Sequence, residues 1–337
     1  MSIEPIPIAI NGLGRIGRAL LRIIQGRRDL QVVAANDSAS PRELARLIRH
    51  DTIHGHYPGS VEALDRGLAL DGRVVPLYRS NDPGEIPWRE SGARFVVEAT
   101  GRFRDRERAS AHLGGGVERV VISATAAAVD ATFCFGVNHA SFDAGRHRVV
   151  SNASCTTNCL AVMLAVLHRT FGVDYALMNT VHCVTNSQNL VDMAHADPRR
   201  ARAAIANIIP TTSDAIPSIG LVIPELHGRV EGLATRVPIV AGSIVDLTVQ
   251  LHRGVSVADV AAAYREAAAG DLEGVLAVTD EELVSSDFVG NPNSAVVDLP
   301  LLQRAGDRLV RVIAWYDNEW GYSSRLADLL VYIGGRT

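Results

Sequence analysis

A glycine-rich segment close to the N-terminus, Asn11-Gly12-Leu13-Gly14-Arg15-Ile16-Gly17, constrains the fold of this chain most strongly. It follows an apolar run, Ile6–Ile10, that predicts a strand, and it opens a segment, Arg15–Gln25, whose apolar spacing predicts a helix. In a strand–turn–helix unit these glycines allow a tight turn, close approach of the backbone to a pyrophosphate, and close packing of helix on strand. The N–H groups that open the helix then favour phosphate. A purely structural glycine turn is the alternative.

An acidic residue, Asp37, follows Gly17 by 20 residues, just after the second predicted strand, Leu30–Ala35. A carboxylate at this position binds the adenosine ribose hydroxyls of a dinucleotide and repels a 2′-phosphate. The sequence therefore predicts NAD as the cofactor. The small polar Ser38 beside it leaves some use of NADP open.

The first part of the chain continues to alternate helical and strand-like segments. Pro41–Ile48 predicts a helix, and Phe95–Glu98 and Val120–Ser123 are short strands that are apolar on both faces. This pattern is typical of parallel strands buried between helices. We therefore expect an α/β fold with a Rossmann doubly wound parallel sheet.

The pattern changes after the middle of the chain. Ala176–Val184, Arg229–Val237 and Ser243–Leu251 predict longer strands with alternating hydrophobicity, and Val257–Ala268 predicts an alanine-rich helix. These features favour an α+β domain with a mostly antiparallel sheet, packed on one face.

A chain of 337 residues is expected to form two domains. We expect a nucleotide-binding domain over residues 1–153 and a catalytic domain over residues 154–318. Apolar residues at helical spacing in Ser324–Ile333 predict that residues 319–337 form a helix that completes the first domain. The alternative is a helix of the second domain.

The composition excludes several classes of function. A net charge of −4 argues against a nucleic-acid partner, and no apolar run is long enough to span a membrane. The sequence contains no lysine, so Schiff-base chemistry is excluded. Met1–Ala9 predicts a first strand and not a signal peptide, so we expect a cytoplasmic protein with reduced thiols and no metal.

Cys155 follows small polar residues and precedes an apolar helical segment, so it falls at a helix N-terminus. That position is expected to lower the pKa of the thiol and favour the nucleophilic thiolate. The hydroxyls of Ser154, Thr156 and Thr157 argue against the alternative, an inert core cysteine. Cys159 lies one turn deeper and is expected to pack as a small hydrophobic residue.

His182 lies in an apolar strand 27 residues after Cys155, which leaves room for a helix and a returning strand. A histidine in such a strand is either a hydrogen-bonded core residue or the base for the thiol. The residues alone leave both readings open.

Segments spread along nearly the whole chain resemble the glyceraldehyde-3-phosphate dehydrogenase family. They are Ile10–Arg18, Asn36-Asp37, Glu98–Phe103, Ser151–Leu160, Ala203-Ala204, Asn207–Pro210, Pro224–Leu226, Arg236–Pro238 and Trp315–Ser323. Of these, Ser151–Leu160 is similar to the active-site signature of the family and is the most specific.

The resemblance implies oxidation of D-glyceraldehyde 3-phosphate to 1,3-bisphosphoglycerate with NAD. Cys155 would attack the aldehyde with His182 as base, and inorganic phosphate would attack the resulting thioester. The N–H of Cys155 and the side chain of His182 would stabilise the oxyanion. The cofactor-binding residues implied by the glycine loop and by the resemblance are Gly12, Gly14, Arg15, Ile16, Gly17, Asp37, Thr100, Gly101, Ser123, Asn318 and Tyr322. Asn318 would orient the nicotinamide amide.

The same resemblance implies two anion sites. Thr185 and Arg236 would bind the substrate phosphate. The residues expected around the attacking phosphate are Ser154, Thr156, Arg200, Ser213 and Asp214. Ser213-Asp214 stands where the family usually has Thr-Gly, which changes the backbone conformations that are easy there. A carboxylate beside a dianion would also weaken binding unless it turned outward or paired with an arginine.

The resemblance further implies a homotetramer, with Asn186–Ile205 near a neighbour's cofactor. Rival readings are an erythrose-4-phosphate dehydrogenase, a paralogue that uses arsenate as acyl acceptor, a cysteine hydrolase, and a non-catalytic binding protein. A role in glycolysis, gluconeogenesis or arsenate resistance also stays open.

Overall fold

The computed structural model describes residues 4–337, and the chain divides into two compact units. The first unit holds the chain up to Phe133, His139–Ala153 and Ser323–Thr337. The second holds Cys134–Asn138 and Ser154–Tyr322, so Cys134–Asn138 lies apart from the domain in which the sequence placed it. Met1–Ile3, part of the predicted N-terminal strand region, lie outside the described residues.

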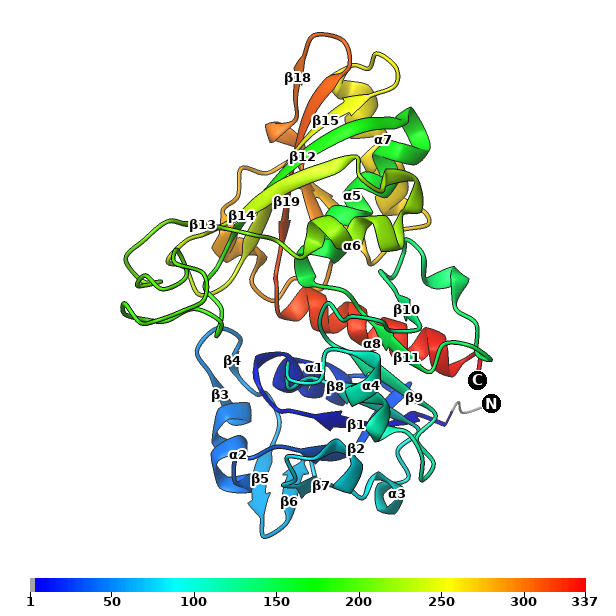
Figure 1. Ribbon diagram of the computed structural model, residues 1–337, viewed down its shortest axis with the longest axis vertical. Helices are drawn as coiled ribbons and strands as arrows, with labels where there is room; N and C mark the ends of the chain where they lie inside the picture. The colour runs from blue at the N-terminus through cyan, green and yellow to red at the C-terminus, as the bar shows by residue number, and fades with distance from the viewer. Residues whose placement is uncertain (1–3) are drawn as a thin grey trace. The chain divides into compact units, whose positions relative to one another are not determined.

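The sheet of the first unit is parallel over most of its width (Figure 1). Its strands, in spatial order, are β10 (Ala131–Thr132), β11 (Val149–Ser151), β9 (Arg119–Ile122), β8 (Phe95–Glu98), β1 (Ile6–Asn11), β2 (Leu30–Asn36), β7 (Arg73–Tyr78), β6 (Gly67–Leu70) and β5 (Val61–Leu64). Pairs from β10 to β7 are parallel, whereas β7, β6 and β5 form antiparallel hairpins. The order β7-β2-β1-β8-β9-β11 is that of a doubly wound dinucleotide-binding sheet, as predicted.

Side chains alternate between two packed faces of this sheet. Ile8 and Ile10 of β1 pack with helices α1 (Arg15–Gln25), α2 (Pro41–Arg49) and α8 (Trp320–Gly334). Ala9 points to the opposite face, which contains Trp88 of α3 (Trp88–Ser91). Apolar residues on both faces explain why these strands lack polar alternation.

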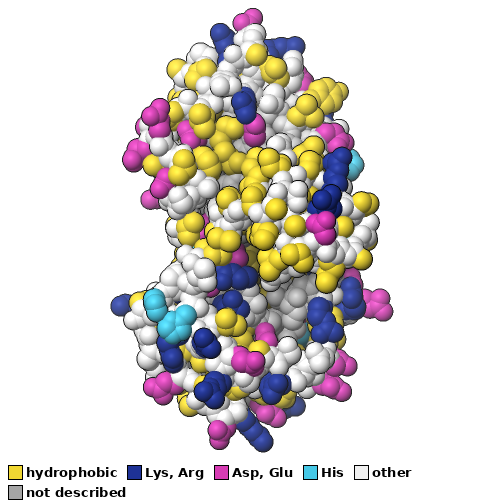
Figure 2. Space-filling view, turned by 90° about the vertical axis from the view of Figure 1, so that its left-hand side faces the viewer, with side chains coloured by type: hydrophobic (Ala, Val, Ile, Leu, Met, Phe, Trp, Pro, Cys, Tyr) yellow, Lys and Arg dark blue, Asp and Glu magenta, His cyan; other side chains and the backbone are white. Residues whose placement is uncertain are grey.

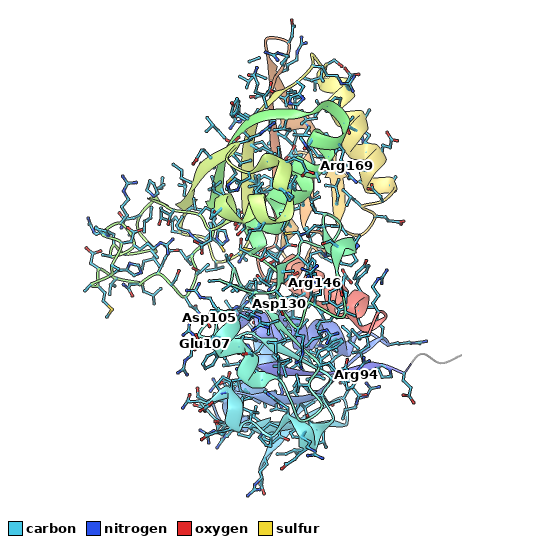
Figure 3. All side chains as sticks on the ribbon, turned by 45° about the vertical axis from the view of Figure 1, so that its right-hand side comes forward. Arg94, Asp105, Glu107, Asp130, Arg146 and Arg169 are labelled. Carbon is cyan, nitrogen blue, oxygen red and sulfur yellow. The ribbon has the colours of Figure 1, made fainter. Side chains whose placement is uncertain are left out.

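Helix α4 (Arg106–Ala109) is tied to the sheet through acidic residues labelled in Figure 3. Asp105 caps the helix, accepting from the Arg108 N–H at 2.8 Å. Asp130 accepts from the N–H groups of Arg148 (2.9 Å) and Val149 (2.8 Å), and it pairs with Arg106. These contacts fix α4 beside β11.

The second unit contains a mostly antiparallel sheet, which confirms the second half of the predicted fold class (Figure 1). Its strands are β13 (Ile209–Thr211), β14 (Val230–Arg236), β12 (Val173–His182), β15 (Ser243–Leu251), β19 (Leu309–Tyr316), β17 (Ala295–Asp298) and β16 (Leu276–Thr279), with β18 (Gln303–Ala305) paired to β19. Helices α5 (Cys155–Phe171), α6 (Ala215–Val222) and α7 (Val257–Ala269) pack on it.

Alternation along β12 decides which side chains reach α5. Ala176, Met178, Thr180 and His182 are buried, whereas Tyr175 and its outward-facing neighbours are more exposed. Since α5 contacts β12 and is itself almost wholly buried, His182 is carried on the packed face of the strand.

The remaining elements are short. They are the hairpin β3 (His50–Asp51) and β4 (Gly55–His56) and the 3₁₀ turns η1 (Pro83–Glu85), η2 (Ser110–His112), η3 (His139–Ser141), η4 (Pro224–Leu226), η5 (Ser285–Phe288) and η6 (Leu299–Leu301). Among the helices of residues 4–337, none is both long enough and apolar enough to cross a bilayer.

Candidate active site

The first unit contains a cavity of about 240 Å³ at the carboxyl ends of β1, β2 and β8. The residues that line it are Asn11, Gly12, Gly14, Asn36, Asp37, Ser38, Ser80, Asn81, Pro83, Ile86, Ala99, Thr100, Arg102 and Phe103. This is the edge at which doubly wound sheets bind nucleotides.

The three loop glycines differ in what surrounds them. Gly12 has a φ of +96°, and a Cβ there would lie 2.8 Å from the N of Thr100. A Cβ on Gly17 would lie 2.0 Å from the carbonyl oxygen of Gly12. Gly14 has no atom within 4 Å of a built Cβ, so open space lies directly over the backbone. The loop therefore leaves room for a pyrophosphate beside Gly14.

The charged residues of this loop are held in place. The carboxylate of Asp37 accepts from the N–H of Leu13 (2.7 Å) and of Ala39 (2.9 Å). Arg15 pairs with Asp51, with Nη1 2.5 Å from Oδ2. Ile16 packs against the apolar core and does not line the cavity.

A buried polar network that the sequence did not predict adjoins the cavity. Glu98 accepts from Asn11 Nδ2 (2.5 Å) and from the Thr100 N–H (2.9 Å), and its Oε2 lies 3.1 Å from His112 Nε2. Trp88 Nε1 donates to His112 Nδ1 at 3.1 Å, so that nitrogen is the acceptor and Nε2 carries the ring proton. The network holds two cavity-lining residues in position. The sequence indicates it only through the polar residues Asn11 and Glu98, which end the strands β1 and β8.

The cavity lining contains Gly12, Gly14, Asp37 and Thr100 of the predicted cofactor residues, and the others, which include Gly101 and Ser123, lie outside it. Gly101 has a φ of +71° and is exposed, and Ser123 follows β9 with its N–H donating to the Glu98 carbonyl at 2.9 Å. Gly101 lies between two residues of the lining, Thr100 and Arg102, whereas Ser123 is connected to the site only through Glu98.

Cys155 is the first residue of α5, as predicted from its polar flank. Ser154 caps the helix, because its Oγ accepts from the N–H of Thr157 at 3.1 Å. The Cys155 sulfur lies 3.5 Å from Nε2 of His182 at the end of β12. The structure thus brings the two predicted catalytic side chains into contact.

The electrostatic surroundings of Cys155 correct one expectation. Burial raises the pKa of the thiol, while the Arg236 guanidinium and hydrogen bonds from Thr156 act in the opposite direction without cancelling it. The sequence predicted a lowered pKa from the helix N-terminus. A raised pKa favours the neutral thiol, so its reaction calls for a base.

His182 is the candidate base in contact with that thiol. It is buried, and its pKa is lowered to about 3 by burial and by the positive charge of Arg236, so the ring is neutral near neutral pH. Arg236 Nη1 lies 2.5 Å from His182 Nδ1 and 3.0 Å from the carbonyl oxygen of Cys183. A predicted substrate-binding residue therefore lies directly against the predicted base.

Asn318 also meets this cluster. Its Oδ1 accepts from the thiol of Cys183 at 3.2 Å, and burial raises the pKa of that thiol to about 12, so the thiol remains a donor. No pattern in the sequence predicted this contact of Cys183. Tyr322 is buried in the same unit.

Thr156 is directed into the protein and does not line an open site. Its hydroxyl lies 2.9 Å from the Tyr316 hydroxyl, which lies 2.9 Å from Thr180. Cys159 is fully buried near Met163, as expected for a packed residue.

Four other residues predicted to bind anions lie in the segment of the chain that connects β12 to α6. They are Thr185, Arg200, Ser213 and Asp214. Arg200 Nε donates to Thr211 Oγ1 at 2.8 Å, and Ser213 Oγ accepts from the N–H of Ala215 at 3.3 Å. Thr185 is hydrogen-bonded to Ser187. Asp214 is exposed and immediately precedes α6. Its φ of −68° is one that any residue adopts, so this position does not require the glycine that the family usually has.

Comparison with known proteins gives consistent results for the two parts of the chain. A family model described as glyceraldehyde 3-phosphate dehydrogenase, NAD binding domain, matches residues 6–106, and one described as the C-terminal domain of that enzyme matches residues 154–318. Glyceraldehyde-3-phosphate dehydrogenase 2 of Streptomyces arenae is 46% identical over 98% of both chains. Glyceraldehyde-3-phosphate dehydrogenase of Kitasatospora aureofaciens is 47% identical over 98% of this chain and 99% of its own. Glyceraldehyde-3-phosphate dehydrogenase 2 of Bacillus subtilis is 46% identical over 98% of this chain and 97% of its own.

Proposed function

This chain belongs to the glyceraldehyde-3-phosphate dehydrogenase family, and from that premise we propose that it converts D-glyceraldehyde 3-phosphate and inorganic phosphate to 1,3-bisphosphoglycerate. It is an NAD-dependent oxidoreductase that acts on an aldehyde. The observation that carries the proposed chemistry is the contact between Cys155 and His182 beside Arg236.

The residues of the first unit fit NAD. The open space over Gly14 suits the pyrophosphate, and the carboxylate of Asp37 lines the cavity where it would accept from ribose hydroxyls. NAD, when bound, supplies the acceptor for the hydride that leaves the substrate carbon. Asn318 would orient the nicotinamide amide, because Cys183 occupies its Oδ1 and leaves its Nδ2 to donate.

The first half of the reaction uses the Cys155–His182 pair. The sulfur attacks the aldehyde carbon while the thiol proton passes to Nε2 of His182, which returns it to the new alkoxide to give a hemithioacetal. When hydride leaves, the hydroxyl proton passes back to His182 and a thioester remains on Cys155. The N–H of Cys155 lies in the first turn of the helix, where N–H groups have no carbonyl partner within the helix, and it would stabilise the oxyanion.

The second half of the reaction releases the product. A phosphate oxygen attacks the thioester carbonyl, the C–S bond breaks, and the departing Cys155 thiolate takes the proton held by His182. Arg200 and Ser213, with Ser154, would bind this phosphate, whereas Arg236 and Thr185 would bind the phosphate of the sugar. The contact between Thr156 and Tyr316 argues for a structural contribution from Thr156.

Substituting the nucleophile tests the proposal. Cys155→Ala should abolish NADH formation from glyceraldehyde 3-phosphate and phosphate, while NAD binding, measured by calorimetry, stays within about twofold of the parent. Turnover that survives the substitution would refute Cys155 as nucleophile. Faster turnover of erythrose 4-phosphate, or of arsenate in place of phosphate, would instead assign the chain to one of the rival activities.

We also propose that the protein forms a homo-oligomer, as the family resemblance implies for a tetramer. Hydrophobic side chains gather on the surface of the second unit (Figure 2). The exposed hydrophobic side chains of this unit include Tyr175, Leu177, Leu190, Val191, Met193, Ile205 and Ile208, each at least 59% exposed. Large exposed apolar patches mark interaction surfaces. Light scattering on the purified protein would test this, and a monomeric mass at micromolar concentration would contradict it.

A further inference from the structure

A pair of histidines on the β3–β4 hairpin lies outside the proposed reaction. His50 and His56 are directly opposite each other in this antiparallel ladder, and both are exposed. Their Nδ1 atoms are 3.1 Å apart, and their rings meet edge to face with centroids 4.7 Å apart. Figure 2 shows histidine side chains grouped on the surface of the first unit, in the lower half of the view.

The separation of the two nitrogens fits a shared metal ion. Imidazole nitrogens bind zinc and similar ions at about 2.0–2.1 Å, so two nitrogens 3.1 Å apart would subtend about 95–100° at the metal. That angle lies between the values of square-planar and tetrahedral coordination, the geometries that Cu²⁺, Ni²⁺ and Zn²⁺ adopt with nitrogen ligands. The bound ion would replace the hydrogen bond between the two Nδ1 atoms, with the lone pairs of both nitrogens turned toward it.

The hairpin that carries the pair is held rigidly. Asp51, next to His50, accepts from the N–H groups of Ile53 and His54, each at 2.9 Å, and pairs with Arg15. On the other strand, Arg22 Nη2 donates to the carbonyl of Gly55, next to His56, at 3.2 Å. The backbone that carries both histidines is therefore held before any ion binds, which reduces the entropy lost on binding.

We propose that His50 and His56 form a binding site for a divalent transition-metal ion on the first unit. Within residues 4–337 no cluster of three or more histidine, cysteine or acidic side chains could hold a metal. Water completes the coordination here, so binding is reversible and prefers imidazole-seeking ions over Mg²⁺ or Ca²⁺. The site is independent of the proposed reaction, although Asp51 connects it to Arg15 of the nucleotide loop.

Titration of the tag-free protein with NiCl₂ at pH 7.5 tests the proposal. Nickel is chosen because it binds imidazole without oxidising the thiols. We expect one Ni²⁺ per chain, and His50→Gln and His56→Gln should each weaken binding by about tenfold or more because each removes one of two ligands. His252→Gln, an exposed histidine of the second unit, is the matched control and should bind as the parent does.

Activity and melting temperature show whether a variant that binds nickel weakly is still folded. Each variant should form NADH at the parental rate without metal, and saturating Ni²⁺ should raise the melting temperature of the parent but not of either variant. Absence of nickel binding in a parent that is active, or binding unchanged in both His50→Gln and His56→Gln, would overturn the proposal. An equal loss in His252→Gln would also overturn it.

Discussion

Arg236 lies against the imidazole of His182, with 2.5 Å between Nη1 and Nδ1, while the other ring nitrogen faces the Cys155 sulfur at 3.5 Å. A guanidinium only donates, so this contact is a hydrogen bond when the ring proton lies on Nε2, whereas the Cys183 carbonyl beside the same nitrogen fits a proton on Nδ1. To take a proton from the thiol, the ring must expose a lone pair at Nε2. Nδ1 gains an alternative acceptor in the Cys183 carbonyl, 2.7 Å away, once Arg236 turns to a substrate phosphate. We therefore expect substrate to select the basic tautomer.

Arg236→Leu should raise the pKa of Cys155, because a cation that favours the thiolate is lost. Alkylation of Cys155 by iodoacetamide should then require higher pH, and the KM for the sugar phosphate should rise about tenfold or more. Arg236→Lys is the matched control, since it keeps the charge but not the forked donors. An alkylation profile that is identical in Arg236→Leu and the parent would show that the guanidinium does not influence the thiol.

The low pKa of His182 predicts how stability depends on pH. The group takes up protons near pH 6.5 when unfolded but only near pH 3 when folded, so the unfolded state binds more protons between these values. The contribution of neutral His182 to the free energy of unfolding is therefore fully present above pH 6.5 and is lost as the pH falls toward 3. The loss amounts to about 2 kcal/mol at pH 5. Urea unfolding at pH 7.5 and pH 5 should show this loss in the parent.

His182→Gln should remove that part of the pH dependence, since glutamine does not titrate. His195→Gln, at an exposed position of the second unit, is the control and should retain the full loss. Equal losses of unfolding free energy in the parent and His182→Gln would contradict a neutral buried ring.

Cys183 is expected to position Asn318 for the nicotinamide amide. Cys183→Ala removes the donor to Oδ1, which allows the amide to flip and should raise the KM for NAD about two- to tenfold. Cys183→Ser supplies a hydroxyl donor and should stay close to the parent. Initial rates at varied NAD would measure both. If alanine and serine behaved alike, the contact would be a packing contact only.

Much of the fold could be predicted because its signals are local. The limits of α1, β8 and β15 are those that the spacing of apolar residues in the sequence predicts. The limits of β12 could not be predicted as well. It begins at Val173, three residues before the expected start, because exposed Tyr175 fits the outward face of a strand only once its partner β15 is known.

The candidate site also has features that could be predicted from neighbouring residues and features that depend on the folded chain. Cys155 and the loop glycines occur in segments whose chemistry is visible in neighbouring residues. The raised pKa of Cys155 was not predictable, because it depends on burial within the second unit rather than on the helix start. The contacts of Glu98 with His112 and of Cys183 with Asn318 join residues 14 and 135 positions apart, so only the folded chain brings them together.

Asp214 tests how charge at the proposed attacking-phosphate site affects the second half-reaction. Its right-handed backbone conformation does not call for glycine, so any effect must come from its exposed carboxylate near Ser213. Repulsion of the dianion should be modest in solvent, and Asp214→Gly and Asp214→Asn should both lower the KM for phosphate about two- to fivefold. Alkylation of Cys155 and the KM for NAD should not change. A lower KM in Asp214→Gly alone would indicate backbone freedom instead of charge, and no change in either variant would place the carboxylate away from the anion.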